Sequence, residues 1–346
     1  MTKKVAVALS GGIDSAVVAA LLLDAGYEVI GLTGKMTCSS EFELVAQNAR
    51  KVADKLGIKH YVVDVSSDFK SNILDYFENS YGNGLTPNPC IMCNKFIKWG
   101  SLFDYAIKEL NADFIATGHY ANIIQDKDVY KLYPASDEHK DQLYFLFLLE
   151  QEKLAKTLFP LSGYKKDEVR KIAEKYDLPP KSAKESQDIC FIKPPITTKK
   201  YLNNIFSPKE GNFVEKSSGK VLGRHDGFWQ FTIGQRKGIG IAYSEPLYVV
   251  EIDAKSNTVF VGIKDDLLRK NIELSDIFWS YPQTEDEFEA LVKVRYNMQA
   301  VPAVIKKQEL NWLVEFETPV SGITPGQACV FYDKFDGHLL GGSFIA

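Results

Sequence analysis

Apolar residues in the first third of the chain follow two periods. Short continuous apolar runs, which predict buried strands, occupy residues 5–9, 29–33, 60–65 and 114–117. Stretches with apolar side chains at helical spacing lie between them, at residues 13–25, 42–56 and 96–110. Because strands that alternate with helices pair in parallel, we expect a parallel sheet with helices on both faces.

Beyond residue 118 short alternating runs replace this pattern. Residues 120–124 and 129–133 flank polar turn residues and predict a hairpin, and residues 164–176 predict a further helix. Runs that predict strands then follow at residues 228–233, 247–253, 258–262, 290–296, 303–307, 312–316, 328–332 and 339–345. The last five of these runs predict a small β-barrel.

The length and composition are typical of a folded protein with more than one domain. The chain has 346 residues, of which 45% are hydrophobic and 25% charged, and this length predicts two or three domains. No segment reaches the roughly 18 uncharged apolar residues that span a bilayer. The apolar run at 5–9 is also shorter than the roughly 7 to 15 residues of a signal-peptide core. We therefore expect a cytoplasmic protein without a membrane partner.

The formal net charge of −4 argues by itself against a nucleic-acid partner. Residues 193–237 depart from that balance, because they contain nine Lys or Arg and three acidic residues. Such a local excess can bind a polyanion, although a solvated basic face is the alternative. Charge alone therefore leaves a nucleic-acid partner open.

The segment Ser10-Gly11-Gly12-Ile13-Asp14-Ser15 joins the first predicted strand to the first predicted helix. Its glycines let backbone N–H groups approach an anion, and the helix N-terminus adds partial positive charge. It is neither a Walker A loop, because no Lys-Ser or Lys-Thr follows, nor a G-x-G-x-x-G dinucleotide loop. The segment predicts a site for an anion such as pyrophosphate, and a plain strand-to-helix turn is the alternative.

Five cysteines, Cys38, Cys90, Cys93, Cys190 and Cys329, occur in the chain. An odd number in a long chain without an export signal does not indicate a disulfide framework. Cys93 lies near the start of a predicted helix, beside Lys95 and Lys98, and both effects lower a thiol pKa. Paired prolines on either side of Cys190 predict an extended connector. Cys38 and Cys329 have no motif and are expected to be buried free thiols.

The glycine segment resembles the SGGxDS loop of the PP-loop ATP pyrophosphatase superfamily. That resemblance implies cleavage of ATP between the α and β phosphates, adenylation of a substrate, and a role for Asp14 in holding Mg²⁺-pyrophosphate. The loop alone does not choose the substrate, because GMP, NAD, argininosuccinate and tRNA lysidine synthetases share it.

Six further motifs resemble those of the bacterial tRNA 2-thiouridylases, in the same order and over nearly the whole chain. They are Asn88-Pro89-Cys90-Ile91-Met92-Cys93-Asn94-Lys95, Thr117-Gly118-His119-Tyr120, Lys140-Asp141-Gln142, residues 186–192, residues 232–238 and Pro325-Gly326-Gln327. The resemblance implies an α/β fold with three domains. These are a parallel-sheet PP-loop domain at 1–200, resembling adenine nucleotide α-hydrolases, a small β-rich tRNA-binding domain at 201–266 and a C-terminal β-barrel at 267–346.

The resemblance also implies an enzyme that uses ATP to thiolate C2 of the wobble uridine, position 34, releasing AMP and pyrophosphate. Cys190 would carry a persulfide, and Cys93 would be the nucleophile that frees its terminal sulfur and closes a Cys93–Cys190 disulfide. The implied partners are tRNAs of the Lys, Glu and Gln type and a sulfur-relay protein or cysteine desulfurase. A flipped uridine would need a pocket near Cys90.

This sequence departs from the common family pattern at Cys90, where many relatives have Asp. Cys90, Cys93 and Cys190 together are a set of thiolates that could hold a [4Fe–4S] cluster with an open iron for hydrosulfide. The persulfide route and the cluster route both stay open. Structural zinc is a third reading, which needs a fourth ligand such as His119.

Two sets of binding residues follow from the resemblance. The ATP contacts it implies are Ala8, Leu9, Ser10, Gly11, Gly12, Ile13, Asp14, Ser15, Gly34 and Gly118. The contacts to tRNA or its base are Asn88, Pro89, Cys90, His119, Lys140, Asp141, Gln142, Arg236, Lys237, Arg295, Tyr296 and Gln327. A hydrogen-bonded histidine in a turn is the alternative for His119, and a solvated turn is the alternative for residues 140–142. Phe228, Trp229 and Phe231 are expected to be strand core rather than platforms for bases.

Two other functions fit part of this pattern. A PP-loop ligase that adenylates a small carbonyl substrate would not need Cys93 or Cys190. A non-enzymatic tRNA-binding or iron–sulfur protein would not convert ATP to AMP and pyrophosphate in response to tRNA.

Overall fold

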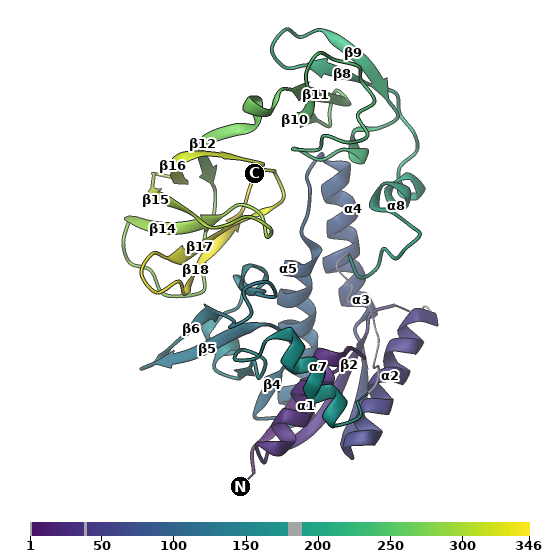
Figure 1. The fold of residues 1–346 in the computed structure, drawn as a ribbon, viewed down its shortest axis with the longest axis vertical. Helices are drawn as coiled ribbons and strands as arrows, with labels where there is room; N and C mark the ends of the chain where they lie inside the picture. Colours follow the sequence, from purple (N-terminus) through teal and green to yellow (C-terminus); the bar gives the residue numbers. More distant parts are fainter. Residues whose placement is uncertain (1, 38–39, 179–188) are drawn as a thin grey trace.

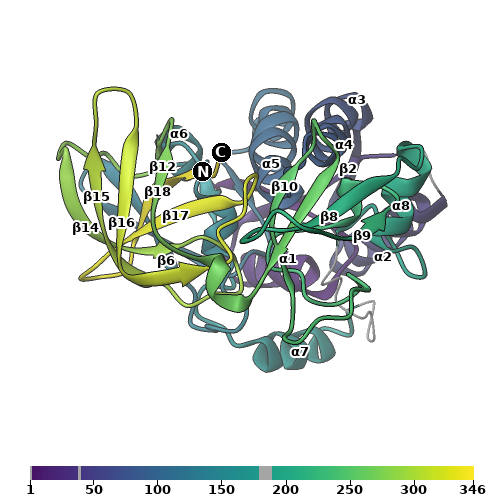
Figure 2. The same cartoon turned by 90° about the horizontal axis from the view of Figure 1, so that it is seen from above.

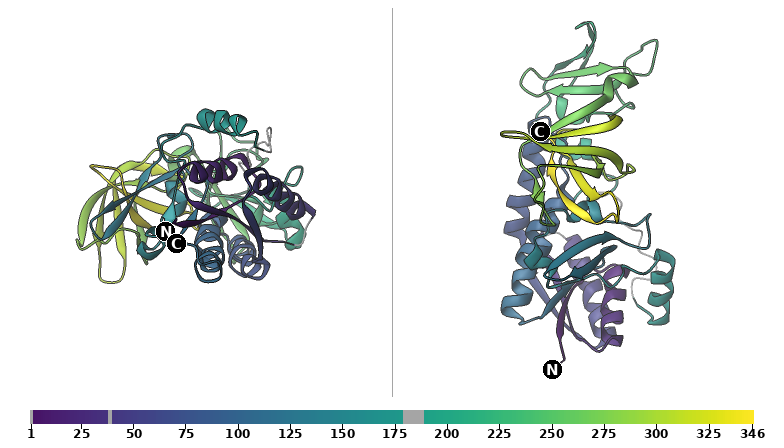
Figure 3. Two further views of the ribbon diagram at one scale, coloured as in Figure 1. Left: turned by 90° about the horizontal axis from the view of Figure 1, so that it is seen from below. Right: turned by 90° about the vertical axis from the view of Figure 1, so that its left-hand side faces the viewer.

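The computed structural model of the chain describes residues 2–37, 40–178 and 189–346. It is elongated, with a parallel sheet at one end, a small β domain at the other and a curled antiparallel sheet at the side (Figures 1 and 3). In the described part of the chain no helix is both long and apolar enough to cross a membrane. A cytoplasmic location stays a prediction.

The N-terminal sheet has five parallel strands in the order β3-β2-β1-β4-β7. Their bounds are β1 Lys4–Ala8, β2 Glu28–Lys35, β3 Lys59–Asp64, β4 Phe114–Ala116 and β7 Thr157–Leu158. Helices α1 (Ile13–Asp24), α2 (Ser40–Leu56) and α7 (Lys166–Lys175) contribute to one core with Val5 and Val7. Ala6 points the other way, into a core with the helices of residues 66–109. The predicted parallel sheet with helices on both faces is confirmed.

The helices between β3 and β4 differ from the prediction. They are α3 Ser66–Phe69, η1 Lys70–Leu74, α4 Asp75–Gly82, α5 Pro89–Cys93, η2 Asn94–Leu102 and η3 Tyr105–Glu109. The helix expected at 96–110 therefore begins earlier, at Pro89, because proline suits the first helical position, where no N–H is needed. The helical residues 66–82 were not predicted.

The predicted hairpin is present as β5 (Ala121–Asp126) and β6 (Val129–Pro134). Two short elements, η4 (Leu143–Leu146) and α6 (Gln151–Leu154), lead to β7. Helix α8 (Thr198–Ile205) was missed, although Thr197 caps it by accepting from the Lys200 N–H at 3.2 Å.

The middle domain is a four-stranded sheet in the order β10-β11-β8-β9. Its strands are β8 Gly211–Glu215, β9 Val221–His225, β10 Tyr248–Asp253 and β11 Thr258–Gly262. Phe228, Trp229 and Phe231 are buried core, as expected. The strand predicted at 228–233 is wrong, because residues Phe228–Gln230 form a helical turn, η5, in which the Trp229 ring packs against Gly227.

The C-terminal domain is a curled antiparallel sheet in the order β12-β16-β15-β14-β17-β18-β13, connected through η6 (Lys264–Leu267). Its strands are β12 Leu268–Leu274, β13 Phe278–Trp279, β14 Glu287–Lys293, β15 Val301–Lys307, β16 Trp312–Ser321, β17 Ala328–Asp333 and β18 Leu339–Phe344. This confirms the expected β domain. It shares a core with the N-terminal domain, in which Ile91 and Trp99 meet Val330 and Leu339. Figure 2 shows α5 between β17 and α4.

Candidate active site at the glycine turn and the cysteine helix

The turn of residues 10–15 follows β1 and leads directly into α1. The Ser10 N–H donates to Ser15 Oγ at 3.2 Å, and Ser15 Oγ donates to the Gly12 carbonyl at 3.1 Å. Gly12 is the N-cap residue and offers no side-chain cap, so α1 has N–H groups free of a capping side chain. An anion fits this helix end.

Glycines are required at and beside the turn because neighbouring atoms leave no room for a Cβ. Gly11 has φ +71°, and a Cβ there would lie 2.9 Å from the Val45 carbonyl oxygen of α2. A Cβ on Gly118, after β4, would lie 3.0 Å from Asp14 Cβ. Ala8, Leu9, Gly34 and Gly118 stand at the carboxyl ends of β1, β2 and β4. The ten residues expected to contact ATP are thus gathered at one edge of the sheet, where such sheets bind ligands.

Asp14 is held by a buried lysine that the sequence analysis missed. Lys166 Nζ lies 2.7 Å from both carboxylate oxygens of Asp14, and its side chain is 7% exposed. The Tyr120 hydroxyl donates to the same carboxylate at 3.1 Å. Asp14 has the oxygen donors that Mg²⁺ prefers, but an ion bound there would have to replace Lys166.

Cys90 and Cys93 stand on one face of α5, a single turn apart. Both are free thiols, as is Cys190, which reaches them from the connector after residue 188. The three are close enough that Cys190 and Cys90 each raise the pKa of Cys93. The structure therefore brings the three predicted thiols together. Cys38 and residues 186–188 lie outside the described residues, and Cys329 is a buried free thiol, as expected.

The expected low pKa of Cys93 is wrong. Burial raises the pKa of Cys93 to about 12, and the nearby Lys98 charge offsets only part of this rise. Cys93 also lies inside the continuous helical run of α5 and η2 instead of at a helix start, and Lys95 lies against the rings of Phe96 and Phe278. Cys90 and Cys190 reach the surface, yet the surrounding protein removes enough water to raise the pKa of each.

Lys98 connects the thiols to the glycine turn. Its Nζ donates to His119 Nε2 at 3.1 Å, and His119 Nδ1 lies 2.7 Å from Thr117 Oγ1. Burial, with Lys98 beside the ring, lowers the pKa of His119 well below its usual value. A neutral His119 accepts from Lys98 and donates to Thr117. Both ring nitrogens are thereby engaged, so His119 does not fit as a zinc ligand.

Comparisons with known proteins match nearly the whole chain, including the glycine turn and the cysteine helix. Three family models match, described as a tRNA methyl transferase HUP domain at residues 3–194, a tRNA methyl transferase PRC-barrel domain at 199–263 and an aminomethyltransferase β-barrel domain at 269–345. The tRNA-specific 2-thiouridylase MnmA of Trichormus variabilis is 43% identical over 99% of this chain and 98% of its own. The chain belongs to the tRNA-specific 2-thiouridylase family.

A second relative and one solved structure are also similar to the chain. The tRNA-specific 2-thiouridylase of Carboxydothermus hydrogenoformans is 41% identical over 99% of this chain and 97% of its own. A solved U34-tRNA thiolase, NcsA from Methanococcus maripaludis with its [4Fe–4S] cluster, is similar at 24% identity and TM-score 0.36, over 54% of this chain and 60% of that one. The chain is accordingly an enzyme of the 2-thiouridylase family. The expected domains at 1–200, 201–266 and 267–346 lie close to the limits of the family matches.

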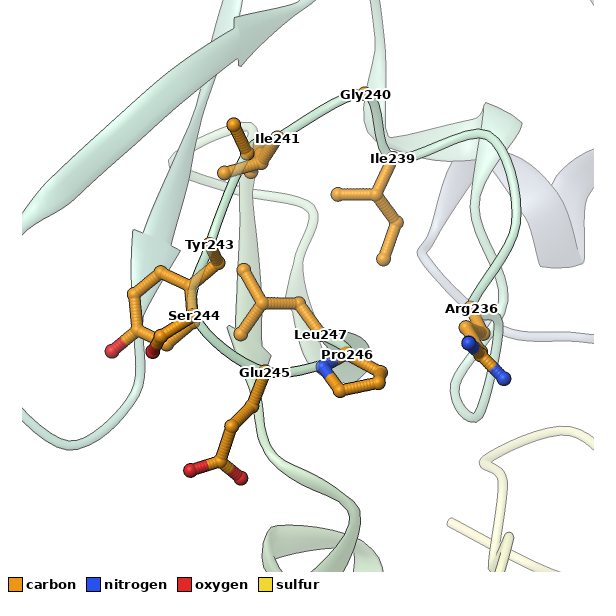
Figure 4. A pocket seen from close by; sticks show the side chains of 10 residues that line it. Arg236, Ile239, Gly240, Ile241, Tyr243, Ser244, Glu245, Pro246 and Leu247 are labelled. Carbon is orange, nitrogen blue, oxygen red and sulfur yellow. The ribbon is translucent and has the colours of Figure 1, made fainter.

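Some residues expected to contact tRNA in a 2-thiouridylase lie at the surface. Arg236 and Lys237 are exposed in the middle domain. Arg236 lines a shallow hollow of about 400 Å³ with Ile239, Tyr243 and Glu245 (Figure 4). This hollow lies in the domain at the far end from the glycine turn (Figure 1).

Other expected tRNA contacts join parts of the fold. Arg295 donates to the Ile233 carbonyl at 2.7 Å and to Thr324, and the Tyr296 hydroxyl donates to the Asp141 carbonyl at 3.0 Å. Gln142 Oε1 accepts from the Tyr120 N–H at 3.1 Å. The contacts of Arg295 with Ile233 and of Tyr296 with Asp141 join the C-terminal domain to the other two domains, whereas the contact of Gln142 lies within the N-terminal domain.

Three further residues that are expected to contact tRNA, Asp141, Asn88 and Pro89, belong to the N-terminal domain. Burial raises the pKa of Asp141, and its carboxylate accepts from the Leu143 N–H at 3.4 Å. Asn88 and Pro89 begin α5 directly before Cys90. Contact of any of these residues with tRNA stays a prediction.

Proposed function

We propose that this protein thiolates C2 of the wobble uridine, position 34, of tRNA at the expense of ATP. The uridine O2 attacks the α-phosphate, pyrophosphate leaves, and C2 is activated as an adenylate. Sulfur then attacks C2 and AMP leaves. The glycine turn is suited to the phosphates, with Mg²⁺ supplying further charge to the pyrophosphate.

One observation carries this proposal. The hydrogen-bonded series Thr117, His119 and Lys98 runs from the strand end beside the glycine turn to the lysine whose charge acts on all three thiols. A nucleotide site and a thiol site that share one positioned network are what adenylation followed by sulfur transfer requires. A PP-loop ligase for a small carbonyl substrate has no use for the second site.

The sulfur step that we favour uses a persulfide on Cys190. A sulfur-relay protein or cysteine desulfurase supplies it, and the Cys93 thiolate attacks the Cys190 sulfur. That attack breaks the persulfide bond, releases hydrosulfide and forms a Cys93–Cys190 disulfide, which a thiol reductant must reopen. Because burial raises the pKa of Cys93, proton loss there depends on the Lys98 charge.

The test combines the purified protein with a tRNA of the Lys, Glu or Gln type, ATP, Mg²⁺ and a cysteine desulfurase with cysteine. Nucleoside mass spectrometry measures 2-thiouridine, and AMP is measured in parallel. Cys93→Ala and Cys190→Ala should each lower thiolation by about 10³-fold, while Cys329→Ala, the buried control, keeps it. Normal thiolation by both variants would overturn the assignment of the sulfur step to these cysteines. AMP formation at the same rate with and without tRNA would favour the small-molecule ligase.

A second candidate for sulfur delivery rests on Cys90. Cys90 and Cys190 are near enough to Cys93 to raise its pKa, and a [4Fe–4S] cluster would take these three thiols as its ligands and would supply an iron site for hydrosulfide. Anaerobic purification with iron analysis and absorbance, for wild type and Cys90→Ala, separates the routes. A wild-type protein that holds no iron when cluster assembly is supported, with a Cys90→Ala variant that thiolates normally, excludes the cluster.

A further inference from the structure

The loop before the cysteine helix is bound to the C-terminal domain. Gln327 Nε2 donates to the Thr86 carbonyl at 2.8 Å and to the Pro87 carbonyl at 3.4 Å. The Thr86 N–H donates in return to the Pro325 carbonyl at 2.8 Å. Two residues of the loop, Pro87 and Pro89, have no N–H of their own, so the loop has few ways to stabilise itself. The Leu85 N–H donates locally, to the Ser80 carbonyl at 2.9 Å, but the partners of Thr86 and Pro87 lie about 240 positions later in the chain.

Gly326 brings the two segments into contact. It has φ +88°, and a Cβ there would lie 2.9 Å from both the backbone N and the O of Thr86. The Gly326 N–H donates to the Ile345 carbonyl, and the Ile345 N–H donates to the Gln327 carbonyl, each at 2.8 Å. The segment that receives the loop is thus tied to the last residues of the C-terminal sheet.

The cysteine helix itself packs against the same sheet. Ile91, between the two cysteines of α5, is fully buried in the core that contains Ala328 and Val330 of β17. The Tyr144 hydroxyl donates to the Ala328 carbonyl at 2.9 Å. Figure 1 shows α5 beside the C-terminal sheet. The sheet therefore contacts both the loop and the helix that carry Asn88, Cys90 and Cys93.

We propose that Gln327 and Gly326 are positioning residues, through which the C-terminal sheet holds the loop before the cysteine helix in its working geometry. This inference rests on the proposed function, because the loop matters for thiolation only if the uridine and the thiols meet beside it. It gives Gln327 a contact within the protein, in addition to the tRNA contact that the family resemblance implies. Loss of the contact to the loop loosens residues 84–93 in the free enzyme and slows the chemistry.

The variants for the test are Gln327→Met, which keeps the length and removes the donors, and Gly326→Ala, which adds the crowded Cβ. Gln308→Met, in the exposed turn after β15, is the matched control. Hydrogen exchange of residues 84–93 is measured in the free enzyme, without tRNA. Each test variant should exchange there about fivefold faster than wild type, with the rest of the sheet unchanged.

Steady-state kinetics supply the second measurement. In Gly326→Ala, which keeps the Gln327 side chain, we expect kcat to fall about tenfold while KM for tRNA stays within about twofold. Unchanged exchange at 84–93 in both variants would overturn the inference, and so would faster exchange with an unchanged kcat. If Gln327→Met does not fold, Gln327→Glu keeps the shape and removes the amide donors. Because exchange is measured without substrate, failure of the proposed function would appear separately, as a wild-type protein that does not thiolate tRNA.

Discussion

The glycine turn and the cysteine site differ in where their geometry comes from. Six consecutive residues form the turn, and its internal hydrogen bonds join neighbours such as Ser10 and Ser15. The cysteine site combines α5 with a connector about a hundred residues later, and the Lys98 charge acts on thiols from both segments. Local sequence therefore suffices to build an anion site, whereas thiol reactivity depends on which groups the fold brings together and how far it buries them.

The largest effect is expected at the turn. In Gly11→Ala, the added Cβ meets the Val45 carbonyl and the residue must keep φ +71°. Binding of Mg²⁺-ATP, measured by calorimetry, should weaken at least about a hundredfold, or about 2.7 kcal/mol. Gly26→Ala has a similar φ of +83° but open space around the Cβ, so it should keep nucleotide affinity. Wild-type affinity in Gly11→Ala would mean that the nucleotide binds elsewhere.

The next-largest effect is expected at a tertiary contact to the turn, the ion pair of Lys166 with Asp14. Lys166→Met leaves Asp14 without its ion-pair partner, and because the Asp14 side chain is 30% exposed and keeps the Tyr120 hydrogen bond, the loss should be about 2 kcal/mol of unfolding free energy. Urea unfolding measures this loss. Lys171→Met, on the exposed face of the same helix, should stay within about 0.5 kcal/mol of wild type. Equal stability of the two variants would show that the turn is as self-sufficient as its local bonds suggest.

At the cysteine site, Lys98→Met removes the charge that lowers the pKa of Cys93 and Cys190. The pKa of each thiol then rises, the thiolate fraction at a given pH falls, and alkylation by iodoacetamide at pH 8 should slow about tenfold. Mass spectrometry of the two cysteine peptides gives the rates. Lys95→Met, three residues earlier and against aromatic rings, is the control. An unchanged alkylation rate in Lys98→Met would show that the Lys98 charge does not act on the thiols.

The smallest effect concerns the pH dependence of stability. Because the pKa of His119 is well below its usual value in the folded chain, the unfolded chain binds a proton that the folded chain does not. Stability should therefore fall as the pH drops below about 6.5. His119→Asn should reduce that fall between pH 6.5 and 5.5 by about 1 kcal/mol, measured by urea unfolding. His139→Asn, an exposed control, should have the wild-type slope.

The sequence by itself predicted most of the regular structure. Strand β1 follows from a continuous apolar run that is buried on both sides, and α7 follows from apolar residues at helical spacing, because its Val169 and Ala173 face the core. Residues 228–233 show where periodicity fails. Their aromatic residues alternate as in a strand, but they fill the core from a helical turn.

The identity of the chemical groups was also present in the sequence: the glycine turn and the three clustered cysteines are motifs with a local meaning. The ionisation state of these groups and the partners that control it were not present in the sequence. The raised pKa of Cys93 comes from burial, and the roles of Lys98, Lys166 and Gln327 come from partners 21, 152 and about 240 positions away along the chain. Lys98 and Gln327 stand beside or within recognisable motifs, but nothing in the local sequence shows which partner each of these three side chains has, because desolvation and long-range hydrogen bonds exist only once the chain has folded.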